Sequence, residues 1–414
     1  MPTPGIDNPK LRNVDAQWIF HKGTRHMRLQ DRLGLSDKVL LVPQNMVQLL
    51  GLCDGTRNFR RLQSDFALRA GLTLSLEQIQ SFVAGMEQAL LLESEAFKQA
   101  SESALRVYRK APYRKSSHTG IVYPSEVTEL NTQISGFVSE IKRSDESETS
   151  NAKLVAMVCP HIDYDRGGKS YAQLFERSRP DLADIETIVM FGTDHSGAAG
   201  ALTPTRQNYM TPHGIIPTDL EIVEGLAKTI GEKRAFSEEL HHVKEHSIEL
   251  ALVWLNYYLG NREISLVPIL CGSFQPFVSE DRDTNSDESI SVAIEYLRKV
   301  TADRRTLVVA AGDLAHIGPA FGDHKPASSV DKTRLAAKDA ESIQAICSGD
   351  AESFLSLSRS ESDARRICGL SAIYMTLKLA ESSYGLSTGY AQCPADQSNS
   401  SWVSIVGALL YKEY

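Results

Sequence analysis

The sequence has no long run of basic residues. Lys and Arg number 44 against 52 Asp and Glu, which gives a formal net charge of −8. Proteins that bind nucleic acids need clustered Lys and Arg to neutralise the phosphates. The charge balance therefore argues against a nucleic-acid partner.

Long apolar stretches are also missing. The longest apolar runs, such as 154–159, are far too short to span a membrane. The first ten residues contain no apolar core of the kind that signal peptides have. Hydrophobic residues make up 42% and charged residues 23% of the chain, as in an ordinary globular protein. We therefore expect a cytoplasmic protein that does not bind membranes.

Paired cysteine motifs are absent, and so are zinc-finger and H-E-x-x-H spacings. In a large chain without an export signal, the six cysteines are expected to be free thiols. A free thiol is a metal ligand, a nucleophile or, most often, a small buried side chain. Any metal site must therefore assemble from distant segments.

A length of 414 residues predicts two domains, or one large domain with an appendage. We place a small domain at 1–100, a linker at 101–112 and a larger domain at 113–414. The polar segments 143–150 and 279–289 have compositions typical of solvated loops.

The small domain shows one strand pattern, at 32–43, followed by three helix patterns. The helices are expected at 44–57, 59–71 and 75–94, the last with Ser75 as its N-cap. A strand region followed by three helices is winged-helix-like.

The run from 49 to 94 resembles PqqD-type peptide-recognition domains, mainly through Cys53-Asp54-Gly55 and its apolar spacing. A helical appendage that packs on the main domain is the alternative. A DNA-reading role is disfavoured because the third helix carries several glutamates and no Lys or Arg.

Beyond residue 113, apolar strand-like runs alternate with amphipathic helices. Buried strands are expected at 154–159, 187–192, 264–270 and 306–312, with a further strand, placed at an edge, at 402–411. Helix patterns lie at 169–177, 219–230, 245–259, 331–347 and 369–382. This alternation predicts an α/β fold with a mainly parallel sheet flanked by helices.

Polar, reactive residues follow three of these strands at once: His161 after the first, His195 after the second, and Asp313 and His316 after the fourth. In open α/β sheets, ligands bind beyond the carboxyl ends of the strands. If the three strands are parallel neighbours, the four residues converge on one crevice. A hydrogen-bonded structural role remains open for any single histidine, but the group favours a functional site.

Glu245, His246 and Glu249 lie in the first turns of a predicted helix. The helix dipole favours acids there, so Glu245 is either a cap or a functional carboxylate. His246 and Glu249 are three residues apart and share a face, which fits a proton-transfer pair or support for a neighbouring ligand. His241 and His242 lie in a more polar stretch, and we expect them to be solvated.

Cys368 precedes an apolar helix pattern, beside Arg365 and Arg366. A cysteine in such a place should have a lowered pKa and more thiolate, the form that binds metals. A buried, inert thiol is the alternative. That alternative is stronger for Cys159, within a strand, whereas Cys271 is ambiguous.

Eight segments resemble the MEMO family, and closely its bacterial and archaeal branch called AmmeMemoRadiSam system protein B. In chain order they are SSHTGIVYPS (116–125), CPHIDYDRGG (159–168), FGTDHSG (191–197), TPHGIIPTD (211–219), KEHSIELALVWL (244–255), VPILCGSF (267–274), AGDLAHIGPAFGD (311–323) and RRICGL (365–370). The resemblance implies a fold similar to class III extradiol dioxygenases, whose non-haem iron is held by two histidines and a carboxylate. In MEMO proteins the corresponding ligands look to be two histidines and a cysteine, which here are His161, His195 and Cys368.

The catalytic candidates also match family motifs. Asp313 and His316 match a Ser-Asp-x-x-His-type motif, and Glu245 and His246 match Glu-His-Ser-Ile-Glu. We expect Asp313 to orient a ligand or substrate group, and His246 and His316 to act as general acids or bases.

The chain departs from the better-known animal members at two positions. It has Asp163 where they have the glycine of Pro-His-Ala-Gly-Tyr, and Asp194 before the histidine where they have Ser-His-His. We expect these carboxylates to lie near the metal and to change its preference or the charge of the pocket. Tyr164 is expected to donate a hydrogen bond to a bound anion.

Two imidazoles and a thiolate suit Fe(II), Zn(II) or copper, whereas magnesium and calcium prefer oxygen ligands. Three protein ligands leave a position open for water or substrate. The resemblance favours Fe(II).

Three hypotheses follow. One is a dioxygenase-like redox enzyme acting with a radical-SAM partner on a small molecule or a peptide, which the N-terminal domain presents. The others are a metal carrier or scaffold, and a zinc-dependent hydrolase with His316 or Glu245 as base. Fold analogy alone does not decide among them.

Overall fold

The computed structural model describes residues 6–141, 152–260, 262–279, 284 and 287–413. Their contacts divide the chain into two compact units, Met1–Lys110 and Ala111–Tyr414, which are described one at a time. Of the two segments predicted to be loops, 143–150 lies outside the described residues, and 279–289 lies outside them in large part.

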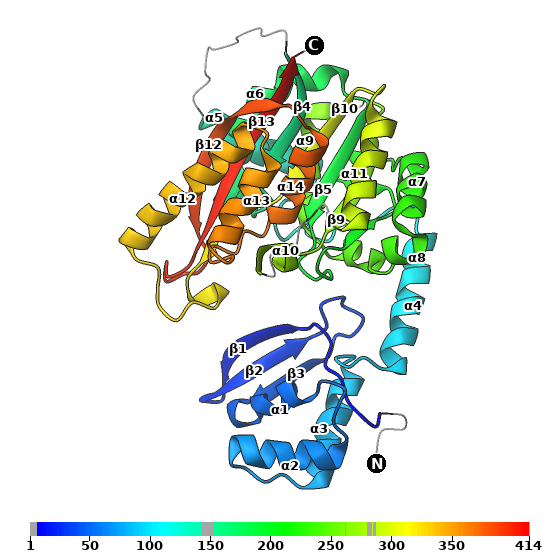
Figure 1. Ribbon diagram of the computed structural model, residues 1–414, viewed down its shortest axis with the longest axis vertical. Helices are drawn as coiled ribbons and strands as arrows, with labels where there is room; N and C mark the ends of the chain where they lie inside the picture. Colours follow the sequence, from blue (N-terminus) through cyan, green and yellow to red (C-terminus); the bar gives the residue numbers. More distant parts are fainter. Residues whose placement is uncertain (1–5, 142–151, 261, 280–283, 285–286, 414) are drawn as a thin grey trace. The chain divides into compact units, whose positions relative to one another are not determined.

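The smaller unit combines a three-stranded antiparallel sheet, in the order β1-β2-β3, with helices that share its apolar core (Figure 1). The strands contribute Leu29 and Val42 to this core, and the helices contribute Leu62, Phe66 and Val83. Its elements are β1 (Asp15–His21), β2 (Thr24–Gln30), β3 (Val39–Pro43), α1 (Val47–Leu52), α2 (Phe59–Ala70), α3 (Leu76–Gln88) and α4 (Glu95–Lys110).

The hairpin β1–β2 was not predicted from the sequence. It turns at Lys22 and Gly23, whose φ angles of 49° and 77° are both positive, as a two-residue type I′ turn requires. The predicted strand at 32–43 is wrong in its first half, because β3 begins only at Val39. The predicted helix at 44–57 is likewise shorter, because α1 ends at Leu52.

Of the other two helix predictions for this unit, 59–71 is confirmed, whereas 75–94 is too long, because α3 ends at Gln88. Helix α2 is found where expected, and Ser75 caps α3 in a capping box with Gln78. Residues 101–110, which we assigned to a linker, form the second part of α4 instead. The winged-helix and PqqD-like assignment of the unit stays a prediction.

The larger unit is an α/β structure built on an eight-stranded mixed sheet. The strands of this sheet are β4 (Ala152–Cys159), β5 (Thr187–Thr193), β6 (Leu202–Pro204), β9 (Ser265–Cys271), β10 (Thr306–Ala311), β11 (His316–Ile317), β12 (Tyr384–Pro394) and β13 (Trp402–Glu413), and β7 (Tyr209–Thr211) and β8 (Gly214–Ile216) form a separate two-stranded sheet. Its helices are α5 (Val127–Ser139), α6 (Tyr164–Ser178), α7 (Leu220–Ile230), α8 (Glu232–Ala235), α9 (Ser247–Leu259), α10 (Gln275–Ser279), α11 (Glu288–Thr301), α12 (Ser329–Cys347), α13 (Ala351–Ser360) and α14 (Leu370–Leu379).

The order of the sheet is β11-β13-β4-β10-β5-β9-β6, with β12 paired to β13. Strands β4, β10, β5 and β9 are parallel neighbours, as the alternating pattern predicted. The outer strands β13, β12, β11 and β6 pair antiparallel. The prediction that 402–411 is an edge strand is wrong, because β13 lies between β4 and the unpredicted strand β12.

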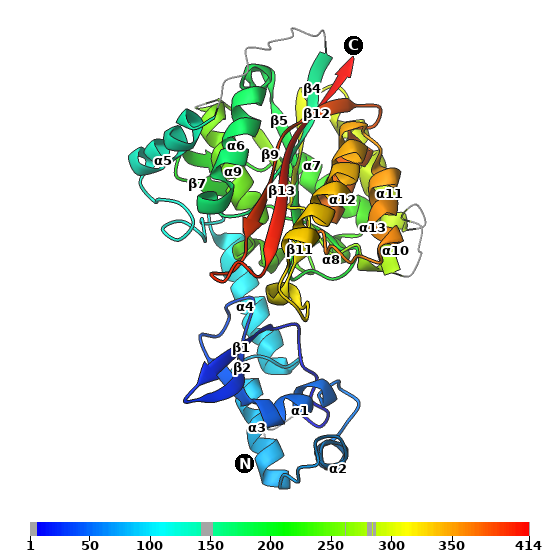
Figure 2. The same cartoon turned by 90° about the vertical axis from the view of Figure 1, so that its left-hand side faces the viewer.

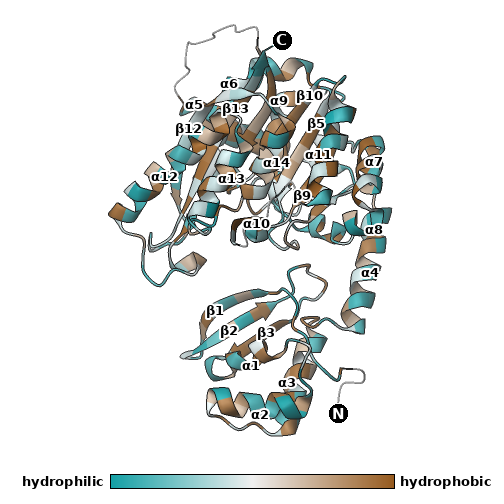
Figure 3. Ribbon diagram, in the orientation of Figure 1, coloured by the Kyte–Doolittle hydropathy of each residue, from teal (hydrophilic) through white to brown (hydrophobic). Residues whose placement is uncertain are grey.

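Helices cover both faces of this sheet (Figure 2). Helices α5, α6 and α9 lie on one face, and α7, α11, α12, α13 and α14 lie on the other. Side chains of the parallel strands alternate between two apolar layers: Val189 and Phe191 of β5 belong to one, Ile188 and Met190 to the other. Figure 3 shows the apolar residues on these inner strands. Burial on both faces explains why the strands are continuous apolar runs.

Among the described residues, no helix is long and apolar enough to cross a membrane.

Candidate metal centre

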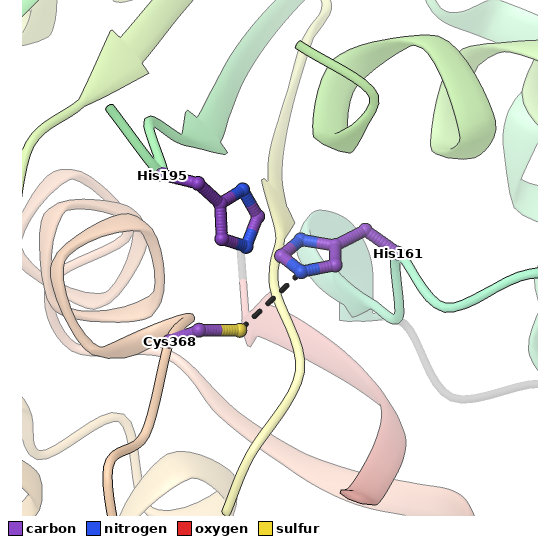
Figure 4. A group of neighbouring side chains, drawn as sticks. All are labelled: His161, His195 and Cys368. Atoms are coloured by element: carbon purple, nitrogen blue, oxygen red, sulfur yellow. Dashed lines mark hydrogen bonds between the residues drawn. The ribbon is translucent and has the colours of Figure 1, made fainter. Parts of the chain in front are cut away.

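The carboxyl ends of three neighbouring parallel strands bring the predicted metal ligands together. His161 follows β4, and His195 follows β5, with β10 between them in the sheet. Cys368 comes from the segment before α14, a helix that lies against these strands. One ligand atom from each residue lies within 4.8 Å of the other two. The three side chains point toward one another (Figure 4).

His161 is held through Nδ1, and its Nε2 faces the other candidate ligands. Its Nδ1 lies 3.1 Å from the carbonyl oxygen of Ala311, which makes Nδ1 the protonated nitrogen. Its Nε2 lies 3.3 Å from Sγ of Cys368. Burial lowers the pKa of His161 well below its usual value, so the ring is neutral, as a ligand must be.

His195 is oriented by a carboxylate. Its Nδ1 lies 3.1 and 3.0 Å from the two oxygens of Glu245, so Nε2 is the candidate ligand atom of this ring. Burial favours the neutral ring, but Glu245 and Cys368 together outweigh it and hold the pKa of His195 well above its usual value. Such carboxylate–histidine pairs commonly orient metal-bound imidazoles.

Glu245 is itself fixed at the start of α9. It accepts hydrogen bonds from the backbone N–H groups of His246 and Ser247, at 2.8 and 3.0 Å, and from that of His195, at 3.1 Å. Burial alone would raise the pKa of Glu245, but His195 and His246 keep it well below its usual value. Glu245 therefore accepts the first backbone N–H groups of α9 and also contacts a metal-ligand candidate, and its role as a functional carboxylate stays a prediction.

A third imidazole, that of His246, stands beside the two ligand histidines. Its ring centroid lies 4.8 Å from that of His195, nearly parallel to it, and 5.0 Å from that of His161. Its Nδ1 lies 3.1 Å from Glu245, so one carboxylate holds two adjacent rings. His246 therefore stands beside both candidate ligand rings.

Cys368 is placed by a close backbone contact. A Cβ atom at Gly312 would lie 2.5 Å from Cα of Gly369, so only glycines allow the Cys368 segment to approach the end of β10. The N–H of Gly369 donates to the carbonyl of Asp313 at 2.9 Å.

The expected lowering of the Cys368 pKa is wrong. Burial raises the pKa of this thiol, although His195 opposes the effect. Arg365 is engaged by Asp339 and Glu361, at 2.8 Å each, and Arg366 by Asp323. The arginines therefore pair with carboxylates rather than with the sulfur.

Asp313 and His316 lie at the same end of the sheet. Asp313 accepts the N–H of His161 at 2.8 Å, and its other oxygen is 3.9 Å from Nε2 of that ring. Burial raises the pKa of Asp313 to about 7. His316 packs edge-on against Phe321, and its Nδ1 lies 3.2 Å from the carbonyl of Leu314. Burial and the charge of His195 lower the pKa of His316 to about 4.

The two additional carboxylates are engaged elsewhere. Asp163 caps α6 and pairs with Arg166. Asp194 accepts from the N–H of Ser196 at 3.0 Å and lies 2.8 Å from Nδ1 of His241. Neither belongs to the group formed by His161, His195 and Cys368.

Several other expectations are corrected by the hydrogen bonds. Tyr164 is fully buried and donates to the carbonyl of Leu250 at 2.7 Å, so its hydroxyl is committed within the core. His242 is buried rather than solvated, with its ring nitrogens on Tyr209 and on the carbonyl of Thr203. Cys159 is buried, as expected for a cysteine within a strand, and Cys271, which the sequence left ambiguous, is buried too; burial raises the pKa of both thiols.

The position of Glu249 on the helix suggested that it pairs with His246, but it does not. It is buried at 1% exposure and pairs with Arg114. It also accepts from the backbone of Ser117 and His118, at 3.0 and 2.9 Å. The ring of His118 in turn lies 5.6 Å from that of His246, although sequence reasoning had not singled out His118. Its one signal was its position in a segment that resembles the MEMO family.

The donor set fits a transition metal. It offers two imidazole nitrogens whose partner nitrogens are occupied, and one thiol. The nearby carboxylates of Glu245 and Asp313 accept hydrogen bonds of their own. Soft and borderline ions such as Fe(II), Zn(II) and copper suit such ligands, and an all-oxygen cage for magnesium or calcium is not what these atoms provide.

Comparisons with known proteins show the family of this chain. The model of the family described as Memo-like protein matches residues 114–408. A MEMO1 family protein of Aquifex aeolicus is 26% identical over 97% of this chain and 100% of its own length. A MEMO1 family protein of Methanosarcina acetivorans is 30% identical over 41% of this chain and 57% of its own. One of Thermococcus onnurineus is 32% identical over 42% of this chain and 56% of its own. The chain belongs to the Memo-like protein family.

Proposed function

We propose that the protein holds one Fe(II) ion on His161, His195 and Cys368 and acts as a dioxygenase-like redox enzyme. The observation that carries the proposal is the convergence of three ligand atoms within 4.8 Å, from three separate segments. In both histidines the remaining nitrogen is already engaged, by Ala311 and by Glu245. Such pre-orientation is typical of metal-binding imidazoles.

When bound, an iron with three protein ligands has positions open for oxygen or substrate, and supplies redox and Lewis-acid chemistry. The surrounding residues handle protons and orientation. Glu245 keeps the ring of His195 turned toward the ion. His246 stands beside both ligand rings and is the candidate acid or base for a molecule at the open position.

Asp313 and His316 have supporting roles in this proposal. Asp313 holds the backbone of His161 and, with a pKa near 7, exchanges a proton near neutral pH. His316 is neutral at that pH, because its pKa is about 4, and therefore serves as an acceptor rather than as an acid.

The substrate in this proposal is a small molecule or a peptide, and a radical-SAM protein is the partner. The resemblance to AmmeMemoRadiSam system protein B and the PqqD-like pattern of the small unit support this part. An alternative is a zinc-dependent hydrolase, since the same donor set suits zinc. Glu245 is then a poor base, because its pKa lies well below the usual value.

The test is elemental analysis of protein purified without oxygen, for the wild type and for His161→Ala, His195→Ala and Cys368→Ala. Matched controls are His324→Ala and Cys347→Ser, which alter the same residue types outside the site. Stoichiometric iron that is lost in the three variants and kept in the controls supports the proposal. Stoichiometric zinc favours the hydrolase, and protein without metal refutes both and leaves a scaffold.

A further inference from the structure

Arg114 is a buried cation that reaches two backbone carbonyls beside the metal centre. Its side chain is 1% exposed. Nε donates to the carbonyl of His242 at 2.7 Å, and Nη2 donates to that of Glu245 at 2.8 Å. The planar guanidinium fixes the directions of these bonds, so Arg114 holds the turn that leads into α9 through two hydrogen bonds.

The guanidinium is in turn held by Glu249. This carboxylate pairs with Nη1 of Arg114 and accepts the hydroxyl of Tyr123 at 2.7 Å. It also accepts the backbone N–H groups of Ser117 and His118, at 3.0 and 2.9 Å. Because both charges are buried and hydrogen-bonded on all sides, neither side chain has freedom to move without breaking the network.

This turn carries Glu245, whose carboxylate orients the metal-ligand candidate His195. The backbone carbonyl of Glu245 accepts from Arg114, and its side chain holds His195 and His246. We propose that Arg114, held by Glu249, is a positioning residue for the metal centre, which sets metal affinity without touching the metal. This inference rests on the proposed role of His195 as a metal ligand.

A purely structural role makes a different prediction. If Arg114 only stabilises the fold, its loss lowers the unfolding temperature but leaves the affinity of the folded protein unchanged. If Arg114 positions the turn, affinity falls in protein that is fully folded at the assay temperature.

The variants separate these cases. Arg114→Met removes the charge and the donors. Arg114→Lys keeps the charge, but a single ammonium group lacks the planar set of donors that lets the guanidinium contact both carbonyls and Glu249. Glu249→Gln loosens the anchor and leaves Arg114 in place. The matched control is Asn256→Ala, because Asn256 also lies buried on α9 and donates to Thr211 at 2.7 Å, away from Glu245.

The experiment titrates full-length protein with Co(II) against a competing chelator, and records the thiolate-to-cobalt absorption band and thermal unfolding of each variant. Arg114→Met should weaken Co(II) binding about 10- to 100-fold, the range typical for groups that orient metal ligands. Arg114→Lys and Glu249→Gln should fall between it and the wild type, and Asn256→Ala should bind as the wild type does.

The inference is overturned if the folded Arg114 variants bind Co(II) as tightly as the wild type, or if Asn256→Ala weakens binding equally at the same loss of stability. Should Arg114→Met fail to fold, Arg114→Lys and Glu249→Gln make the same comparison. A wild type that binds neither cobalt nor iron refutes the proposed function, and this inference with it. A wild type that binds while the Arg114 variants are unchanged refutes the inference alone.

Discussion

Replacing Glu245 by Gln removes one negative charge from the metal centre with almost no change of shape. The carboxylate accepts hydrogen bonds from His195, His246 and Ser247 through both of its oxygens. A glutamine has one acceptor oxygen, and its NH₂ group would face backbone N–H groups that now donate to the carboxylate. His195 therefore loses both its ionic partner and its orientation.

The expected size of the effect follows from these contacts. Loss of a group that orients a metal ligand weakens metal binding about 10- to 100-fold, which is about 1.4 to 2.7 kcal/mol. An unsatisfied buried donor adds a loss of about 1–3 kcal/mol in folding stability. The variant should thus be less stable without metal and bind metal more weakly when folded.

The pH dependence of metal affinity tests the role of Glu245 more directly. In the metal-free wild type, Glu245 raises the pKa of His195, so the metal must displace a proton until the pH exceeds that pKa. In Glu245→Gln the pKa of His195 falls back toward the usual value near ~6.5. The proton on His195 then stops competing with the metal at a lower pH. The affinity defect should therefore grow as the pH rises above the usual histidine pKa of about 6.5.

The assay is competition between Co(II) and a chelator at several pH values, with thermal unfolding of the metal-free forms. Glu224→Gln is the control, because Glu224 pairs with Arg206 on α7 and has no contact with the ligands. Unchanged affinity in Glu245→Gln, or a defect that does not vary with pH, would refute the assigned role of Glu245.

Three further predictions concern other parts of the structure. Burial lowers the pKa of His242 to about 4, so between about pH 4 and 6.5 only the unfolded chain binds a proton at this residue. The free energy of unfolding should therefore rise by about 3 kcal/mol over this pH range. In His242→Gln, the free energy of unfolding measured with denaturant should rise less steeply with pH over the same range. Gly312→Ala should lose both stability and Co(II) binding, because its Cβ would lie 2.5 Å from Gly369 and displace Cys368; retained binding would contradict this. Gly23→Ala should destabilise the small unit by about 1 kcal/mol, because the turn needs a positive φ, and proteolysis of that unit should become faster.

The parallel centre of the large sheet could be predicted because its signal is local. Each buried strand is an apolar run, and three of the four are followed directly by a polar cluster. Two parallel strands end at the same edge of a sheet, so His161 and His195 had to meet if their strands were near neighbours. That condition holds, with β10 between β4 and β5.

Contacts between distant segments were out of reach of this reasoning. The sequence places Glu249 on the same face as His246, yet the structure turns it to a segment that begins more than a hundred residues earlier, at Arg114. His242 looked solvated because its neighbours are polar, whereas its partners Tyr209 and Thr203 come from other strands. The β1–β2 hairpin was missed because its turn, Lys22-Gly23, lacks the asparagine or aspartate that usually marks it.

The scattering of the donors has a thermodynamic consequence. His161, His195, Glu245 and Cys368 come from four segments that only the folded sheet and its helices bring together. An unfolded chain offers no comparable set of ligands, so a metal that binds the site binds the folded state and stabilises it. At a free metal concentration 100 times the dissociation constant, this linkage amounts to about 2.7 kcal/mol. The raised pKa values of Cys368 and His195 act against it, because protons occupy the same atoms in the metal-free protein. The shift in unfolding temperature on adding metal should therefore increase with pH. This one measurement reports both metal binding to the folded state and the loss of protons from the ligands.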